Sequence, residues 1–151
     1  MNQTAIKFLA CGFGSGLAPV APGTFGTLAG VPICLLCMPL SWFWRLLVVV
    51  ALTALSIYVS YRAEEIYQKK DDQRIVIDEI IGLQVTMLPV TITALHLFAG
   101  FILFRIFDIL KPFPLKSLQN LPGGWGVVLD DVGAGIYAGT LLFVFYWLEI
   151  I

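Results

Sequence analysis

The residues best suited to chemistry in this 151-residue chain are five carboxylates in three short clusters. They are Asp78-Glu79, Asp108 and Asp130-Asp131, and each cluster adjoins an apolar stretch. An ionised carboxylate near hydrocarbon persists only when it is paired, solvated or bound to a metal. Three such clusters beside three apolar blocks therefore predict one site for a hard cation, assembled from distant parts of the chain.

Two basic residues flank the middle acid. Arg105, Asp108 and Lys111 are three residues apart and would share one face of a helix. We expect Pro112 to end that helix and to hold Lys111 in an extended conformation. The spacing fits an intrahelical salt-bridge ladder. It also fits a guanidinium and an ammonium that hold a metal-bound phosphate at a membrane face.

The paired acids have simpler explanations as well. Asp78 could cap an apolar helix, with Glu79 in its first turn, where the helix dipole favours a carboxylate. We expect Asp130-Asp131 to open the last helix; one aspartate suffices for a cap, and a second adds repulsion that a divalent cation would relieve. Beyond them Gly135 and Gly139 make a small face, along which a helix or a lipid chain could approach the acids.

A glycine- and proline-rich segment from Gly12 to Thr27 is a second candidate for binding. It matches neither a nucleotide-binding loop nor a dinucleotide fingerprint. Its glycines would let backbone N–H groups approach an anion, with Ser15, Thr24 and Thr27 as hydroxyl donors. The alternative is a tight loop, pinned by its prolines, that binds no ligand.

The composition points to a membrane. Hydrophobic residues make up 59% of the chain and charged residues 13%, and the mean hydropathy is +0.91. A net charge of −1 favours no nucleic-acid partner. The length predicts a single domain, residues 1–151. We expect the three cysteines, which lie in apolar surroundings, and His96 to be structural, and we expect no cleavable signal peptide.

Helices must position the acids, because the apolar runs are long and no alternating strand pattern occurs. Residues 28–39 and 41–60 predict a two-helix hairpin that turns at Pro39. Residues 80–104 are interrupted near Pro89, which allows one kinked span or two half-helices that dip in and return. Residues 132–151 predict a C-terminal transmembrane helix. The expected fold is an all-helical integral membrane domain.

A shared site requires the three acid clusters on one membrane face. The hairpin satisfies this requirement, and residues 80–104 satisfy it only as a returning pair of half-helices, which we therefore favour. The last helix would then leave the C-terminus on the far side. Seven of the nine Lys and Arg residues fall in the connectors that carry the acids, whereas Arg45 lies near the opposite end. The positive-inside rule makes the acid-bearing face cytoplasmic.

Four motifs give the chain a resemblance to the phosphatidylglycerophosphatase A family over nearly its whole length. They are GSGLAPVAPGTFG at 14–26, IVIDEIIG at 75–82, FRIFDILKPFP at 104–114 and GGWGVVLDDVGAG at 123–135. The resemblance implies a helical, magnesium-dependent lipid phosphatase of the bacterial membrane, which converts phosphatidylglycerophosphate to phosphatidylglycerol. Relatives often carry an aspartate after the Lys-Pro-x-Pro segment. This chain has Gln119 there, so we assign no metal role to that position.

The residue types agree with that chemistry by elimination. The chain lacks the Cys-x5-Arg of cysteine phosphatases, the Asp-x-Asp of haloacid-dehalogenase-type enzymes, and the second histidine that histidine-nucleophile phosphatases need. The remaining option is carboxylates with Mg²⁺ as cofactor. We expect the metal ligands, one of which is also the general base, to be Asp78, Glu79, Asp108, Asp130 and Asp131.

The substrate phosphate is expected to bind Ser15, Thr24, Arg105 and Lys111, and Lys111 to assist catalysis. Either water or an aspartate could attack phosphorus. The expected reaction is hydrolysis of the terminal phosphomonoester of a phospholipid, by a multi-pass protein of the bacterial cytoplasmic membrane whose active site faces the cytoplasm. A cation transporter would also place acids beside membrane helices, but it would leave the glycine-rich segment and the Arg105/Lys111 pair unexplained. A membrane scaffold would need no acid clusters.

Overall fold

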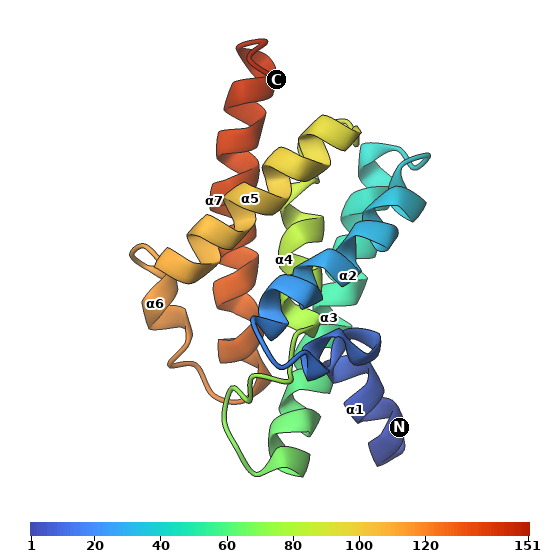
Figure 1. The fold of residues 1–151 in the computed structure, drawn as a ribbon, viewed down its shortest axis with the longest axis vertical. Helices are drawn as coiled ribbons and strands as arrows, with labels where there is room; N and C mark the ends of the chain where they lie inside the picture. Colours follow the sequence, from blue (N-terminus) through green and yellow to red (C-terminus); the bar gives the residue numbers. More distant parts are fainter.

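A computed structural model describes all 151 residues and contains helices but no strands (Figure 1). The elements in chain order are α1 (Gln3–Ala10), the 3-10 helix η1 (Gly12–Leu17), α2 (Pro22–Cys37), α3 (Trp42–Tyr67), α4 (Ile77–Thr86), α5 (Ala94–Leu110), α6 (Leu115–Leu118) and α7 (Gly124–Trp147). Two of them, α3 and α7, are long and apolar enough to cross a membrane. The predicted all-helical membrane fold is confirmed.

The short helix α4 lies at the centre of the bundle and packs against α2, α3 and α7. Eight of its ten residues are buried. Its closest neighbour is α7, where glycines replace bulkier side chains: a methyl group at Gly135 would lie 2.6 Å from the carbonyl oxygen of Gly82. A methyl group at Gly139 would lie 2.9 Å from the carbonyl oxygen of Thr86. The predicted small face of the last helix therefore receives another helix.

The predicted break near Pro89 is confirmed. The helix α4 ends at Thr86, and α5 begins at Ala94 after Thr93, whose hydroxyl accepts a hydrogen bond from the N–H of His96 at 3.1 Å. From there α5 returns obliquely across the front of the bundle (Figure 1). The predicted hairpin is also present as α2 and α3, and α4 packs against both of its arms.

Two predicted helix boundaries and one predicted backbone conformation are wrong. The helix α7 begins at Gly124, so Asp130 and Asp131 lie about two turns inside it rather than at its start. Residues 22–27 belong to α2, with Pro22 in its first turn, and not to a loop. Lys111 is left-handed (φ 42°, ψ 63°) rather than extended, and its N–H donates to the carbonyl of Phe107 at 2.8 Å.

Tertiary contact explains the early start of α7. Glycine is a poor helix former, so propensity favours a loop around Gly124 and Gly126. The absence of side chains there lets the helix lie directly on α3, since a methyl group at Gly124 would collide with the carbonyl of Ile57. Packing of the two long helices outweighs the low propensity of their contact residues.

The N-terminal elements surround the beginning of α4. The N–H of Val76, which precedes α4, donates to the carbonyl of Ala10 at the end of α1. A methyl group at Gly26 of α2 would lie 2.6 Å from Cβ of Val76. Before it, the buried Asp72 carboxylate accepts hydrogen bonds from the backbone N–H and from Nε of Arg74, at 3.1 and 2.7 Å. These contacts fix where α4 starts.

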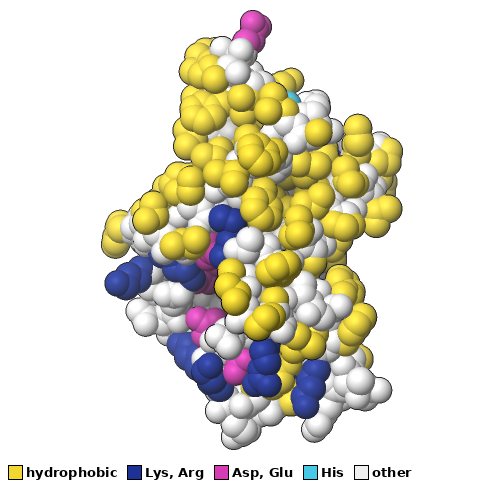
Figure 2. Space-filling model, in the orientation of Figure 1, with side chains coloured by type: hydrophobic (Ala, Val, Ile, Leu, Met, Phe, Trp, Pro, Cys, Tyr) yellow, Lys and Arg dark blue, Asp and Glu magenta, His cyan; other side chains and the backbone are white.

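The surface divides into two parts. Hydrophobic side chains cover the upper part of the face in Figure 2, over α5, α2 and the upper end of α7, whereas most Lys, Arg, Asp and Glu side chains gather below. Among the exposed apolar residues are Phe98, Ile109 and Leu36, which are 68%, 70% and 77% exposed. Such a large apolar surface is typical of contact with a bilayer.

Candidate active site

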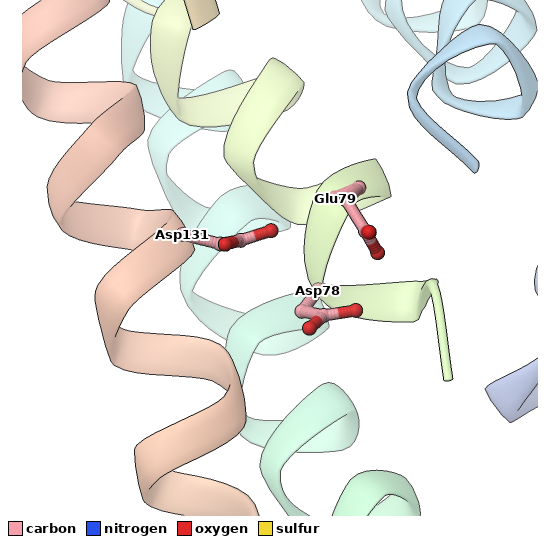
Figure 3. A group of neighbouring side chains, drawn as sticks. All are labelled: Asp78, Glu79 and Asp131. Carbon is pink, nitrogen blue, oxygen red and sulfur yellow. The ribbon is translucent and has the colours of Figure 1, made fainter. Parts of the chain in front are cut away.

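Three carboxylates from two helices meet in one cluster (Figure 3). Asp78 and Glu79 lie in the first turn of α4, where the helix dipole favours negative charge. Asp131 comes from the facing side of α7, and one oxygen of each of the three residues lies within 4.8 Å of the others. Asp78 is not the helix cap, since Val76 occupies that position. Its burial beside two other acids therefore has no capping explanation.

The other two predicted acids lie beside cations. Nη1 of Arg105 binds Oδ2 of Asp108 at 2.7 Å, and Nζ of Lys111 lies 3.7 Å from Oδ1 of the same carboxylate. Lys111 also forms an ion pair with Asp130 of α7. The predicted salt-bridge ladder along α5 is therefore present. Its last residue, Lys111, also contacts α7, so that one ammonium lies between Asp108 and Asp130.

The charge of Lys111 is maintained by its partners. Burial alone would lower the pKa of this ammonium, but the hydrogen bond to Asp130 and the charges of nearby aspartates outweigh that effect and raise the pKa. Lys111 therefore stays protonated at neutral pH. It can offset negative charge, and it cannot serve as a base.

The N-terminal end of α2 completes the border of the cluster. A methyl group at Gly23 would collide with Oε1 of Glu79 and lie 3.1 Å from Nη1 of Arg105. The same guanidinium donates to the hydroxyl of Thr27 at 3.4 Å, and that hydroxyl donates to the carbonyl of Gly23 at 2.9 Å. Gly23 lies in the glycine- and proline-rich segment that the sequence offers for binding, but it was not predicted as a site residue. Its place after Pro22 at a helix start is a signal that could have found it, because a glycine there lets a partner approach the backbone.

Several buried polar atoms of these residues have no hydrogen-bond partner. They are Oδ1 of Asp78, Oε2 of Glu79, Nε of Arg105, Oδ1 of Asp130 and Oδ2 of Asp131. Unpaired buried groups of this kind are destabilising, and five carboxylates exceed the two cations beside them. Oxygen atoms from Asp78, Glu79 and Asp131 fit a hard divalent cation such as Mg²⁺, and the cluster contains neither histidine nor cysteine.

Ser15 and Thr24, the two predicted phosphate-binding residues of the N-terminal segment, lie in different helices. Ser15 lies in η1, and its hydroxyl donates to the carbonyls of Gly12 and Cys11 at 2.8 and 3.4 Å. Thr24 is half-buried in the first turn of α2, adjacent to Gly23. Their contact with a phosphate stays a prediction.

The residues expected to be structural lie outside the cluster. Sγ of Cys34 donates to Oε1 of Gln84 at 3.3 Å. Nδ1 of His96 lies 2.5 Å from the carbonyl oxygen of Thr91, and its ring packs edge-on against Tyr146. All three cysteines are free.

The clustered carboxylates and the two cations beside them thus lie in a helical bundle with two helices long and apolar enough to cross a membrane, the class of integral membrane protein that the sequence predicts. Comparison with known proteins identifies the family within this class. Residues 8–146 match the family described as Phosphatidylglycerophosphatase A, and the chain belongs to that family, whose members are phosphoric monoester hydrolases. The predicted resemblance is confirmed.

Three relatives are similar over most of their length. The chain is 38% identical to the phosphatidylglycerophosphatase A of Escherichia coli, covering 90% of this chain and 81% of the relative, and 37% identical to that of Haemophilus influenzae, covering 95% and 90%. It is also 38% identical to a putative phosphatidylinositol-3-phosphatase of Bacteroides thetaiotaomicron, covering 90% of both chains. No solved structure matches the chain.

Proposed function

We propose that this protein hydrolyses the terminal phosphomonoester of phosphatidylglycerophosphate, releasing phosphatidylglycerol and inorganic phosphate, in a reaction that requires Mg²⁺. The observation that carries the proposal is the cluster of the buried Asp78 and Asp131 with the half-buried Glu79, each with an unpaired buried oxygen, in a chain of this family. Water would supply one oxygen and two protons, and the bond between phosphorus and the lipid oxygen would break.

The two cations have separate tasks in this proposal. Arg105 carries an Nε–H without a partner, which makes it a free donor for a phosphoryl oxygen. Lys111, already held between Asp108 and Asp130, offsets charge that develops on the transferring group. Asp108 binds both cations, so its role is to orient them and not to accept a proton.

The remaining carboxylates would hold the metal and supply the base. Asp78, Glu79 and Asp131 are the ligands that the geometry supports best, and Asp130, which follows Leu129 and precedes Asp131, is paired with Lys111. Bound Mg²⁺ would supply charge neutralisation and polarisation of a phosphoryl oxygen. One member of the cluster then either takes a proton from the attacking water or attacks phosphorus itself. The stereochemical course at phosphorus separates the two, since a single displacement by water inverts the configuration of a chirally labelled phosphoryl group, whereas two successive displacements through an enzyme acyl phosphate retain it.

The proposed location is the cytoplasmic membrane, with the site on its cytoplasmic side. The connectors beside the acids carry most of the basic residues, which favours that side. The basic and acidic side chains lie together below the apolar surface in Figure 2, so a headgroup could reach them while the acyl chains stay in the bilayer.

A second candidate substrate is a phosphatidylinositol 3-phosphate. The Bacteroides relative named for that activity is as similar to this chain as the Escherichia coli phosphatidylglycerophosphatase. Both substrates are phosphomonoesters on a lipid headgroup, so the same acids and cations would serve either. They differ in whether the phosphate is carried by a glycerol or by a ring.

Phosphate release by the purified protein in lipid vesicles tests the proposal. We expect turnover of phosphatidylglycerophosphate with Mg²⁺, at least about 100-fold loss after chelation, and recovery when Mg²⁺ is added back. Phosphatidylinositol 3-phosphate and phosphatidic acid are the comparison substrates. Faster turnover of the inositol lipid would favour the second candidate, and full activity under chelation would contradict the metal requirement.

A further inference from the structure

Arg45 lies in the first turn of α3 and contacts the turn after α4, whose other end carries Asp78 and Glu79. A cation is unfavourable at this end of its own helix, because a helix N-terminus already carries partial positive charge. The proposed topology also places it on the side where basic residues are disfavoured. Its presence therefore needs a partner outside α3.

The partner is the turn that follows α4. Nη1 and Nη2 of Arg45 both donate to the carbonyl of Val90 at 3.0 Å, and Nη2 also donates to the carbonyls of Leu88, at 3.2 Å, and Met87. Met87 is the C-terminal cap of α4. The guanidinium thus binds acceptors that no helical bond satisfies, at the negative end of that helix dipole.

The two ends of α4 are charged in the complementary sense. Asp78 and Glu79 occupy its positive first turn, and Arg45 contacts the turn after its last residue. Ten residues make a rod of about 15 Å, so a shift of one end along the axis moves the other by a similar amount. Asp131 belongs to α7, which does not follow that shift.

We propose that Arg45 is a positioning residue that sets the axial position of α4 and so keeps Asp78 and Glu79 aligned with Asp131. It acts through α4 and touches neither the acids nor the substrate. The kinetic part of this inference rests on the proposed function and the metal-binding part on the proposed metal site, whereas the structural part, which hydrogen exchange measures, rests on the contacts of Arg45 alone.

The test compares Arg45→Gln and Arg45→Lys with a matched control, Thr93→Ala, in the full-length protein in lipid nanodiscs. Thr93 caps α5 at the same end of the molecule but makes no hydrogen bond to α4 or its turn. The readouts are kcat and KM for the lipid, Mn²⁺ affinity by electron paramagnetic resonance, and hydrogen exchange of residues 77–90.

For Arg45→Gln we expect kcat to fall by about 10- to 100-fold with little change in KM, since small displacements of reacting groups have effects of that size. Mn²⁺ should bind about 10-fold more weakly and amides of α4 should exchange faster. Arg45→Lys should recover part of the kcat and of the Mn²⁺ affinity, because an ammonium can still bind carbonyls. Thr93→Ala should lose thermal stability and keep the wild-type Mn²⁺ affinity.

Wild-type Mn²⁺ affinity and exchange in Arg45→Gln would overturn the inference, as would the same weakening of Mn²⁺ binding in Thr93→Ala. Should Arg45→Gln fail to fold, Arg45→Lys decides: faster exchange at α4 with unchanged Mn²⁺ affinity overturns it. If the wild-type protein releases no phosphate from any lipid, the proposed function fails, and the Mn²⁺ and exchange measurements still decide on Arg45.

Discussion

Asp78, Glu79 and Asp131 differ from Asp108 in what surrounds them. Asp108 is bound by Arg105 and Lys111, whereas the three clustered acids face one another without a cation in contact. Mutual repulsion of buried carboxylates is relieved by a proton or a metal ion. The division suggests that loss of a clustered acid affects metal binding first, and loss of Asp108 affects the alignment of the cations.

Asp131→Asn should lower phosphate release by two or more orders of magnitude, because it removes a charge from the cluster while preserving its shape. Mn²⁺ affinity should fall with it. Asp108→Asn should also lower kcat but leave Mn²⁺ affinity nearer the wild-type value. Equal Mn²⁺ affinity in wild type and Asp131→Asn would contradict the assignment of this residue as a ligand.

Lys111→Ala should lower kcat by about 100-fold, because it removes charge compensation from a buried site. The matched control is Lys116→Ala, since Lys116 is an exposed basic residue of α6. Steady-state phosphate release from the same vesicles measures both variants. Similar effects of the two substitutions would mean that Lys111 acts only as part of a basic surface.

Asp72 offers a test of stability rather than chemistry. The hydrogen bonds from Arg74 lower the pKa of Asp72 from 3.8 to about 2. That pKa shift corresponds to a contribution of at most about 2.5 kcal/mol to the free energy of unfolding. Arg74 is 43% exposed, and solvent screening reduces the expected contribution to about 1 kcal/mol.

The pKa of Asp72 is lower in the folded protein than in the unfolded chain. The stabilisation that its ion pair provides is therefore complete at pH values above the pKa of the unfolded chain, and it is lost as pH falls towards 2. Asp72→Asn should therefore lower the melting temperature at pH 7, and the gap to wild type should narrow progressively below pH 4. Thermal unfolding in detergent at pH 7, 4 and 3 measures this. If the difference in melting temperature between wild type and Asp72→Asn stayed constant from pH 7 to pH 3, the ion pair between Asp72 and Arg74 would not be the cause of that difference.

At the scale of helices, the contact between α4 and α7 decides whether the acids meet. Gly135→Ala would place a methyl group 2.6 Å from the carbonyl oxygen of Gly82 and 2.9 Å from Cβ of Val85. We expect a loss of about 1–3 kcal/mol in stability, as for other overpacked contacts, together with reduced activity and Mn²⁺ affinity. Ile136→Ala, on the exposed side of the same helix, is the control and should leave activity unchanged.

The five main helices follow from the sequence because they depend on local pattern, whereas the short elements α1, η1 and α6 were not predicted. Long apolar runs define α3 and α7, and Pro89 breaks the run between α4 and α5. The starts of α2 and α7 cannot be predicted from the sequence, because the low helix propensity of glycine favours a loop there. Only contact with a neighbouring helix makes these residues helical. The left-handed Lys111 has no local cause either, since the residue before proline usually extends.

The composition of the site is predictable to a similar degree. All five acids and both cations are recognisable by their cost near hydrocarbon. Their grouping is not, because it depends on which turn of α7 faces α4. The role of Arg45 also escapes the sequence, since its partners are backbone carbonyls, which carry no side-chain signal.

At the scale of the whole molecule, the connector before α4 and the segment after α6 lie together. Nζ of Lys70 donates to the carbonyl of Gln119 at 3.0 Å, across 49 residues. This contact places both segments on one side of the bundle, as a returning α4–α5 pair requires. The C-terminus lies at the opposite end (Figure 1).

Thiol labelling in intact cells tests the proposed topology. In a cysteine-free version, Asp71→Cys and Asn120→Cys should react with a membrane-impermeant reagent only after the cytoplasmic side is opened, because both exposed positions lie near the basic connectors. Ile150→Cys should react from outside. Labelling of positions 71 and 120 from opposite sides would mean that α4 and α5 together cross the membrane once.

The central position of α4 also has a consequence for biogenesis. Asp78 and Glu79 are synthesised more than 50 residues before Asp131, and α4 is too short to cross a bilayer alone. A nascent chain that ends before α7 would leave two acids and a ten-residue helix without their main packing partner. The proposed site can therefore form only after α7 has been synthesised and has packed against α4, and a chain truncated before α7 would lack one of the three clustered acids.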